Sequence, residues 1–121
     1  MDKVESFEDL WIWQEARILV REIYGDFGND TPAGRDYGFR GQIQSAGISI
    51  MNNIAEGFER TTDADKARFF DIAKGSSGEV RSMYYAAEDI KYLTSDVAVQ
   101  RREKAGKISK GIATLTSRFR Q

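Results

Sequence analysis

Apolar residues recur at every third or fourth position along four long segments, and this helical period is the feature that most constrains the fold. The segments are residues 7–27, 36–60, 63–93 and 96–119. Short connections between long amphipathic helices favour antiparallel neighbours. A chain of 121 residues has the length of one domain. The sequence therefore predicts an all-α fold in which residues 1–121 form a single domain, an antiparallel, up-and-down four-helix bundle.

Turn-forming and helix-capping residues mark the ends of these segments. The only proline, Pro32, lies in GNDTPAGRDYG (28–38), where Gly, Asn, Asp and Thr cluster as in a loop. RTTDAD (60–65) and LTSD (93–96) each offer a Thr or Ser as an N-cap, with Asp in the next turn. SFED (6–9) has the form of a capping box. These signals indicate where the chain turns between helices.

Each segment carries one apolar stripe that we expect to face the core. The predicted stripes are Leu10, Trp13, Ala16, Val20, Ile23 and Phe27; Phe39, Ile43, Ala46, Ile50, Ile54 and Gly57; Phe69, Ile72, Ser76, Val80, Met83, Ala87 and Ile90; and Ala105, Ile108, Ile112, Leu115 and Phe119. The first two helices carry further apolar residues outside their stripes, Ile12 and Leu19 among them, which indicates burial on a second side. Our candidates for a subunit interface are Trp11, Ile18, Ile48, Met51 and Phe58.

Cysteine and histidine are both absent. Their absence excludes disulfides, thiolate nucleophiles, Ser-His or Cys-His catalytic arrangements and the usual zinc ligand sets. No carboxylates converge at a shared spacing, so we expect no metal site, no cofactor and no catalytic residue. Residues 1–3 do not open a signal sequence, and no apolar run approaches the roughly 20 residues of a membrane span. We therefore expect a cytoplasmic protein without membrane contact.

A polar stripe borders the apolar face of the second helix. If the second and third helices form a hairpin that turns near residues 61–62, Glu79 lies level with Gln42 and Ser45. Glu79 is predicted to project between core residues, a costly place for a lone carboxylate unless it is hydrogen-bonded. GSSG (75–78) is predicted to let the two helices approach closely. The predicted structural network comprises Gln42, Ser45, Ser49, Asn53, Glu56, Arg60, Arg68, Ser76 and Glu79.

A carboxylate active site that uses Glu56 or Glu79 is the alternative interpretation of this stripe. The hairpin places these two residues some 18 Å apart along the bundle axis, at about 1.5 Å per residue. That distance is too long for paired acid and base catalysis. We therefore prefer the structural interpretation.

Charge is distributed unevenly along the chain, although the formal net charge is -1. Residues 1–95 carry 11 Lys and Arg against 17 Asp and Glu, whereas residues 96–121 carry seven against two. A basic helix can dock phosphates or an acidic part of another subunit, and charge alone leaves both possibilities open. The candidate phosphate or partner contacts are Arg101, Arg102, Lys104, Lys107 and Lys110. No aromatic residue interleaves these cations between residues 96 and 118, which disfavours sequence-specific reading of RNA bases.

Three sequence blocks, taken together, resemble a known bacterial family. FEDLWIWQEA (7–16), QIQSAGISIMNNIAEGFER (42–60) and FFDIAKGSSGEV (69–80) are similar to the four-helix-bundle proteins encoded in intervening sequences of 23S ribosomal RNA genes, some of which are labelled S23 ribosomal proteins. The resemblance covers about residues 7–93, and the fourth helix matches only in pattern. The family tends to have Pro where this chain has Met51.

The resemblance implies an up-and-down bundle that assembles as a ring-like homopentamer, and it does not imply an enzyme. A relative of similar structure, the accessory protein of diversity-generating retroelements, binds a reverse transcriptase and nucleic acid through basic surface. We therefore expect a homo-oligomeric binding protein, with RNA or an RNA-binding protein as the second partner. A pure protein scaffold, whose basic helix pairs with acidic surface of the next subunit, is the alternative.

Overall fold

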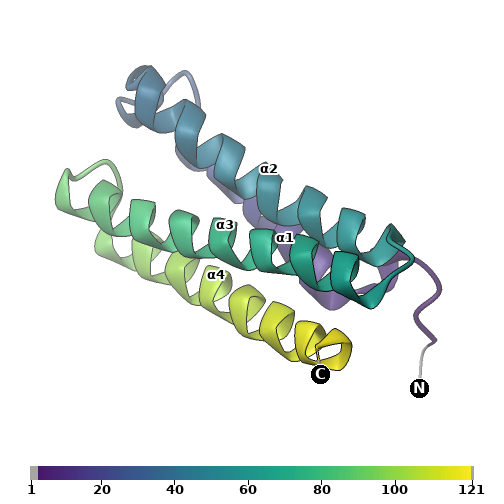
Figure 1. The fold of residues 1–121 in the computed structure, drawn as a ribbon. Helices are drawn as coiled ribbons and strands as arrows, with labels where there is room; N and C mark the ends of the chain where they lie inside the picture. The colour runs from purple at the N-terminus through teal and green to yellow at the C-terminus, as the bar shows by residue number, and fades with distance from the viewer. Residues whose placement is uncertain (1–2, 121) are drawn as a thin grey trace.

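The computed structural model describes residues 3–120 and contains four α-helices and no strand in that range. The helices are α1 (Trp11–Asp26), α2 (Tyr37–Glu59), α3 (Asp63–Asp89) and α4 (Ser95–Thr116), and short 3-10 turns lie at Phe7–Asp9, Ala33–Arg35 and Ser117–Phe119. Successive helices run in opposite directions (Figure 1). α3 packs between α2 and α4, and α1 packs against both α2 and α4. The predicted all-α four-helix bundle is confirmed.

Side-chain caps fix the starts of three helices. The side chains of Asp36, Thr62 and Thr94 accept hydrogen bonds from backbone N–H groups three residues later, at 3.2–3.3 Å. The first helix begins at Trp11 and not at residue 7, because Leu10 adopts an extended conformation that separates a 3-10 turn from the helix. The carboxylate of Asp9 accepts a hydrogen bond from the backbone of Ser6 at 3.2 Å and closes that turn.

The third helix ends at Asp89, four residues before its predicted end. Lys91 has a left-handed backbone conformation with a φ of 69°. The N–H groups of Lys91 and Tyr92 donate to the carbonyls of Glu88 and Ala87, at 3.0 and 2.9 Å. This double hydrogen bond is a Schellman motif, which satisfies the last carbonyls of a helix and turns the chain.

The loop between α1 and α2 is compact as well as polar. The hydroxyl of Thr31 donates to the carbonyl of Gly28 at 2.8 Å and accepts from the N–H of Gly34 at 2.9 Å. A Cβ atom on Gly34 would lie 1.8 Å from the Gly28 carbonyl oxygen, so only glycine fits there. The loop thereby leads the chain into α2, which runs without a break through Met51.

The core runs along the bundle axis and contains most of the predicted stripes, but five residues of the stripe predicted for the third helix are not buried, although Met83 packs against the core. The buried residues are Phe70, Ala73, Ser77 and Tyr84, each one position after the predicted Phe69, Ile72, Ser76 and Met83. Packing of Phe70 on Gly57 and a hydrogen bond from Tyr84 to Asp26 fix this rotation of the helix. Ile90 is also exposed and not in the core, as the helix has already ended there.

Two further expectations about packing are corrected. Ile12 and Leu19, which we placed outside the stripe of the first helix, are buried in the core of the chain. Gly75 and Gly78 do not allow α2 to approach α3, because a Cβ atom on either would have nothing within 4 Å. Of the GSSG segment, Ser77 alone is fully buried, and Ser76 faces α2. None of the four described helices is long and apolar enough to span a membrane.

Candidate functional site

The five cations predicted to contact phosphates or a partner divide into two groups. Arg101, Arg102 and Lys104 form ion pairs with carboxylates of the same chain. Lys107 and Lys110 form no ion pair within residues 3–120. The first group joins helices of the bundle, and the second leaves its charge available to a partner. The charge pattern of the sequence could not distinguish the two groups.

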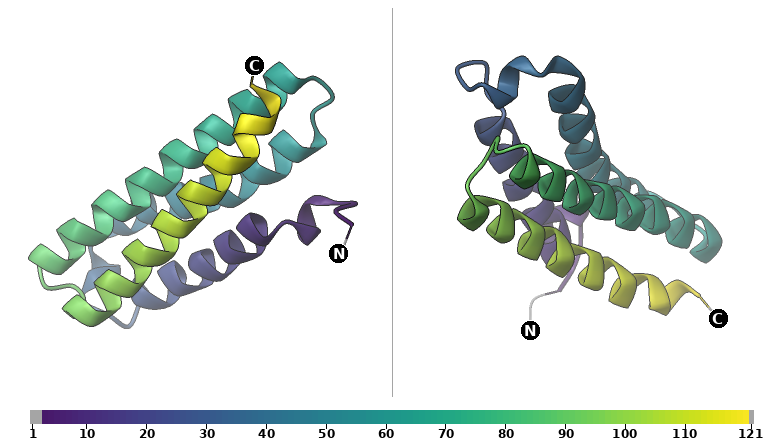
Figure 2. Two further views of the ribbon diagram at one scale, coloured as in Figure 1. Left: turned by 90° about the horizontal axis from the view of Figure 1, so that it is seen from below. Right: turned by 90° about the vertical axis from the view of Figure 1, so that its left-hand side faces the viewer.

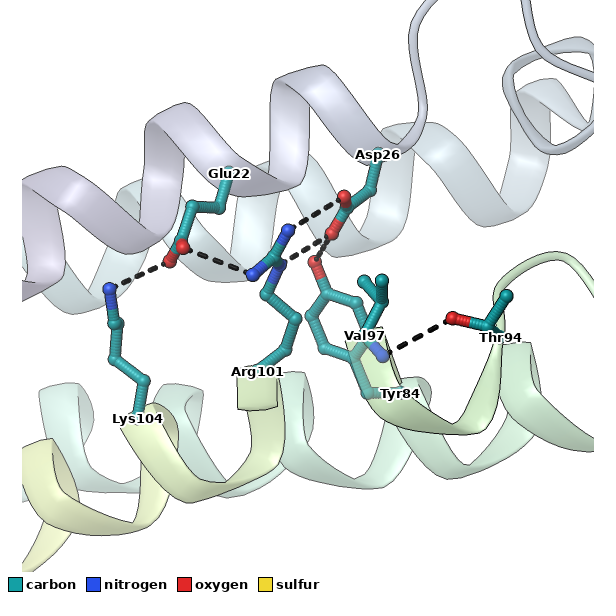
Figure 3. A network of polar contacts seen from close by, with 7 residues as sticks. All are labelled: Glu22, Asp26, Tyr84, Thr94, Val97, Arg101 and Lys104. Carbon is teal, nitrogen blue, oxygen red and sulfur yellow. Dashed lines mark hydrogen bonds and ion pairs between the residues drawn. The ribbon is translucent and has the colours of Figure 1, made fainter. Parts of the chain in front are cut away.

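Arg101 lies at the centre of a network that joins α4 to α1 (Figure 3). Its Nε and Nη2 atoms donate to the two oxygens of Asp26 at 2.8 and 3.0 Å, and its Nη1 atom donates to Glu22 at 3.0 Å. Lys104 Nζ lies 2.9 Å from the other Glu22 oxygen. Tyr84 of α3 donates its hydroxyl proton to Asp26 at 2.8 Å. One set of charge-assisted hydrogen bonds thus joins three helices.

This network changes the pKa of two of its members. Burial, and then the negative charge of Asp26, raises the pKa of the Tyr84 hydroxyl far above its ordinary value of 10.0. The hydrogen bond to Asp26 also raises the pKa of the Arg101 guanidinium. Tyr84 therefore stays a neutral hydrogen-bond donor. The positive charge of Arg101 is already neutralised by the carboxylates of Asp26 and Glu22.

Arg102 points to the opposite side of α4, toward α3. Its Nη1 atom donates to Glu88 at 3.0 Å, and its guanidinium lies 4.0 Å from the ring centroid of Tyr85. A hydrogen bond from Ser95, followed by the contact with Arg102, lowers the pKa of the Glu88 carboxyl. A second ion pair therefore joins neighbouring helices of the bundle.

Two grooves flank the free lysines Lys107 and Lys110, one on each side of α4. The groove toward α1 has Trp11 in its wall, and the groove toward α3 has Arg81 and Tyr85. In Figure 2 (left), α1 and α4 diverge toward the ends marked N and C, where the first groove lies. Sequence reasoning missed Arg81 and Tyr85 because they lie on α3. Matching levels across the α3–α4 hairpin, as for α2 and α3, would have placed Tyr85 opposite Arg102.

The polar stripe of α2 meets α3 at two of the expected levels. Gln42 donates to Glu79 at 3.1 Å, and the hydroxyls of Ser49 and Ser76 lie 2.7 Å apart. Asn53 donates to the carbonyl of Ser49 at 2.8 Å. Glu79 is exposed and not among core residues, because the rotation of α3 carries it to the surface. A shallow groove at this level is lined by Gly41, Gln42, Ser45, Ala46, Ser49, Ser76 and Glu79.

The remaining residues of the predicted network, Glu56, Arg60 and Arg68, make short-range ion pairs and contacts with one aromatic ring. Glu56 accepts a hydrogen bond from Arg60 at 2.8 Å, four residues later. Arg68 approaches Asp65 at 3.7 Å and does not meet Glu56. The guanidiniums of Arg60 and Arg68 lie 4.4 and 4.5 Å from the ring centroid of Phe69. Phe69, which we placed in the core, is thus the ring on which two surface arginines rest.

The candidate interface residues differ in how much surface they leave open. Trp11 is 52% exposed, although its ring rests on Gly111 of α4, and Ile48 is 36% exposed. Ile18, Met51 and Phe58 are half-buried, and Met51 packs against the core. Two residues that the sequence assigned to the core are also exposed apolar residues. They are Ile72, at 43% exposure, and Ile90, at 54%.

Comparison with known proteins identifies the relatives of this bundle. The model of the family described as 23S rRNA-intervening sequence protein matches residues 8–114. The chain belongs to this family. No curated protein matches the chain in sequence. The match extends through most of α4, which in the sequence resembled the family only in pattern.

The fold of this 23S rRNA-intervening sequence protein is shared with a solved structure. A 1.70 Å crystal structure of a protein of unknown function from the S23 ribosomal protein family of Bacteroides thetaiotaomicron VPI-5482 superposes with a TM-score of 0.82. The alignment covers 88% of this chain and 96% of the other, at 17% identity. At that identity the likeness shows a common fold and no more. The family description names no reaction, and the neighbour's function is unknown.

Proposed function

We propose that the protein is a non-enzymatic homo-oligomer whose outer apolar side chains hold copies of the chain together. The observation that supports this best is the exposure of Trp11, Ile48, Ile72 and Ile90, which keep 36–54% of their surface open. Ile72 of α3 and Ile90, the C-cap residue that directly follows α3 in αR conformation, lie on one line along the helix surface, since 18 residues at 100° per residue make five full turns. Aligned apolar residues on an outer helix face are typical of a protein interface.

A ring is the form of assembly that this arrangement favours. Trp11 packs on Gly111 and so lies on the side of α1 next to α4. Ile72 and Ile90 lie on the line of α3 that includes Glu79, which is bonded to Gln42 of α2. The patch at Trp11 and the patch formed by Ile72 and Ile90 therefore lie on opposite sides of the bundle. Contact between different patches of identical chains is heterologous, and it closes into a ring when the rotation permits. The family resemblance implies five subunits, so we propose a homopentamer.

The polar stripe has a structural role in this proposal. Glu56 is paired with Arg60, and Glu79 is bonded to Gln42. Both carboxylates are exposed, and each has a polar partner on its own or the adjacent helix. Among residues 3–120, no three carboxylates gather into a group that could hold a metal ion. We therefore assign the stripe to the α2–α3 contact and assign no catalytic role to either glutamate.

The molar mass in solution, measured by light scattering during size-exclusion chromatography, tests the proposal. We expect a multiple of the 13.7 kDa chain mass, and a pentamer in particular. Ile72→Ser should shift the mass toward that of one chain. Tyr85→Ser is the matched control, because Tyr85 lies on the other edge of the same helix and is 53% exposed. A monomeric wild-type chain at micromolar concentration would rule the proposal out.

A second candidate function, binding of a polyanion such as RNA through α4, is favoured by the free side chains of Lys107 and Lys110. Arg101 and Lys104 already neutralise Glu22 and Asp26, so they offer little charge to a partner. Salt-dependent binding of RNA, measured by fluorescence anisotropy at low and high salt, tests this function. If RNA is not bound at low salt, the scaffold without nucleic acid remains.

A further inference from the structure

We propose that the groove between α3 and α4 binds single-stranded nucleic acid, with a base stacked on Tyr85 and the adjoining phosphates on Arg81 and Lys110. This inference rests on the second candidate function and names the site that performs it. The groove is lined by Arg81, Tyr85, Val99, Arg102, Glu103, Gly106, Lys107 and Lys110. Its position on the α3–α4 side separates it from the apolar patches of α1 and from the α2 side of α3.

Tyr85 provides a stacking surface that is open and fixed. The side chain is 53% exposed, although the Arg102 guanidinium covers one face of the ring at 4.0 Å from its centroid. The exposed surface is therefore the other face and the ring edge. Arg102 is itself held by Glu88 at 3.0 Å, and both of these side chains are largely buried. A ring fixed in this way loses little conformational freedom when a base stacks on it.

Three further cations line the groove together with the ring, so a strand that stacks on the ring could also reach them. Arg81 precedes Tyr85 by four residues and so lies one turn away on the same face of α3. Arg81, Lys107 and Lys110 form no ion pair within residues 3–120, so their charges are available to phosphates. Gly106 forms the floor between the helices, where its missing side chain leaves room beside Arg81.

The combination of an aromatic face and free cations selects the class of ligand. Single-stranded nucleic acids are bound by a positive groove that follows the backbone and by aromatic rings on which bases stack. In a duplex the base faces are already stacked and cannot reach a ring on a helix surface. An acidic peptide would use the cations but would gain nothing specific from the flat face of Tyr85. The groove therefore favours a single strand over both of these ligands.

One carboxylate opposes this ligand and provides a further test. Glu103 lies in the lining of the groove and forms no ion pair within the described part of the chain. Its negative charge would repel a phosphate placed between Arg81 and Lys110. Glu103→Gln should therefore strengthen binding of a strand, and it should do so most at low salt.

The test is the affinity of the full-length chain for a labelled 12-nucleotide single strand, as RNA and as DNA, and for an abasic strand of equal charge. Tyr85→Ser should weaken binding of both strands with bases by about tenfold and leave the abasic strand unchanged. Arg81→Gln should weaken all three ligands and reduce the slope of log affinity against log salt by about 0.7. Tyr37→Ser is the matched control, since Tyr37 is an exposed tyrosine of α2 that does not line the groove, and it should change nothing.

Each result separates this inference from the function on which it rests. If Tyr85→Ser binds like the wild type while Arg81→Gln binds more weakly, the groove binds phosphates without stacking, and the inference fails while polyanion binding stands. Equal affinity for duplex and single strand, or for an acidic peptide of the same charge, also overturns it. If no strand binds at low salt, both the stacking site and the polyanion-binding function are ruled out. If Tyr85→Ser weakens the binding of RNA and DNA equally, stacking of a base on Tyr85 is common to both strands. A larger effect on one of them identifies the strand that the groove prefers.

Discussion

At the scale of single residues, glycines decide how closely the helices approach. A Cβ atom on Gly57 of α2 would lie 2.6 Å from the ring of Phe70 and 3.2 Å from the carbonyl of Lys66. The ring of Phe70 therefore rests directly on the backbone of α2. Gly78, in the middle of α3, has nothing within 4 Å of such an atom. Both glycines lie within helices, but Gly57 is covered by a side chain of the neighbouring helix and Gly78 is not, so the pair separates packing from helix propensity.

Gly57→Ala should destabilise the protein by about 1–3 kcal/mol, because the overlap with a buried ring outweighs the gain in helix propensity. Gly78→Ala should stabilise it by about 0.5–1 kcal/mol, since it gains the propensity alone. Urea unfolding followed by circular dichroism at one protein concentration measures both. Stabilisation of similar size in both variants would show that Phe70 does not rest on Gly57.

Tyr84 is a residue whose contribution depends on pH. At pH 7 we expect Tyr84→Phe to cost about 1.5 kcal/mol, the loss of a hydrogen bond to a charged acceptor. Because the pKa of Tyr84 is raised in the folded protein, its stabilising effect is complete below pH 10 and is lost as pH rises above 10.0, where the unfolded chain releases the proton. Wild-type stability should therefore fall toward that of the variant by about 1.4 kcal/mol per pH unit. Urea unfolding at pH 7, 9 and 11 measures the difference, and a constant difference would contradict this account.

At the scale of elements, the sequence predicted what depends on local chemistry. The loop at Pro32 and the caps at Thr62 and Thr94 follow from residues that act on their own backbone, and all three appear in the structure. The rotation of α3 could not be predicted in the same way. Phe69 and Phe70 are equally apolar neighbours, and a helix with few large side chains has no strong preference between adjacent faces.

The candidate site was predictable only in part, for the same reason. The excess of cations on α4 can be counted in the sequence, but their partners are brought together by tertiary packing. Glu22 and Asp26 lie more than 70 residues from Arg101 in the chain. Tyr85 lacked a signal of its own, because an aromatic residue in a helix more often marks the core than a surface. In the structure Tyr84 is fully buried in the core, whereas its neighbour Tyr85 is 53% exposed.

The ion pairs of Arg101 join α1 to α4, so this element contact should be sensitive to removal of its cation. Arg101→Gln leaves Asp26 and Glu22 half-buried without their main counter-charge, and it should cost about 3 kcal/mol. Lys107→Gln, on the same helix without an ion pair, should change stability by less than about 0.5 kcal/mol. Thermal unfolding of both variants beside the wild type measures the two costs. Equal small effects would mean that the network does not hold α1 in place.

At the scale of the whole molecule, the acidic and basic parts of the sequence meet inside one chain. α4 carries the excess of positive charge, and its inner edges pair with Glu22 and Asp26 of α1 and with Glu88 of α3. Lys107 and Lys110 are the cations of this helix that form no ion pair within residues 3–120. Apolar side chains on the outer faces, Ile72 among them, keep a large part of their surface exposed. Assembly and any binding of nucleic acid should therefore depend on different forces.

Salt separates these forces in one experiment. Contacts between apolar faces are not screened by ions, so we expect the oligomer to keep its mass between about 0.05 and about 1 M sodium chloride, a range over which the Debye length falls about fourfold. Binding of a single strand in the α3–α4 groove should weaken steeply over the same range, because phosphate contacts release counterions. Light scattering and fluorescence anisotropy on the same samples measure both quantities. Dissociation of the oligomer at high salt would instead indicate subunits held by charge, and would place the free lysines Lys107 and Lys110 at the subunit interface.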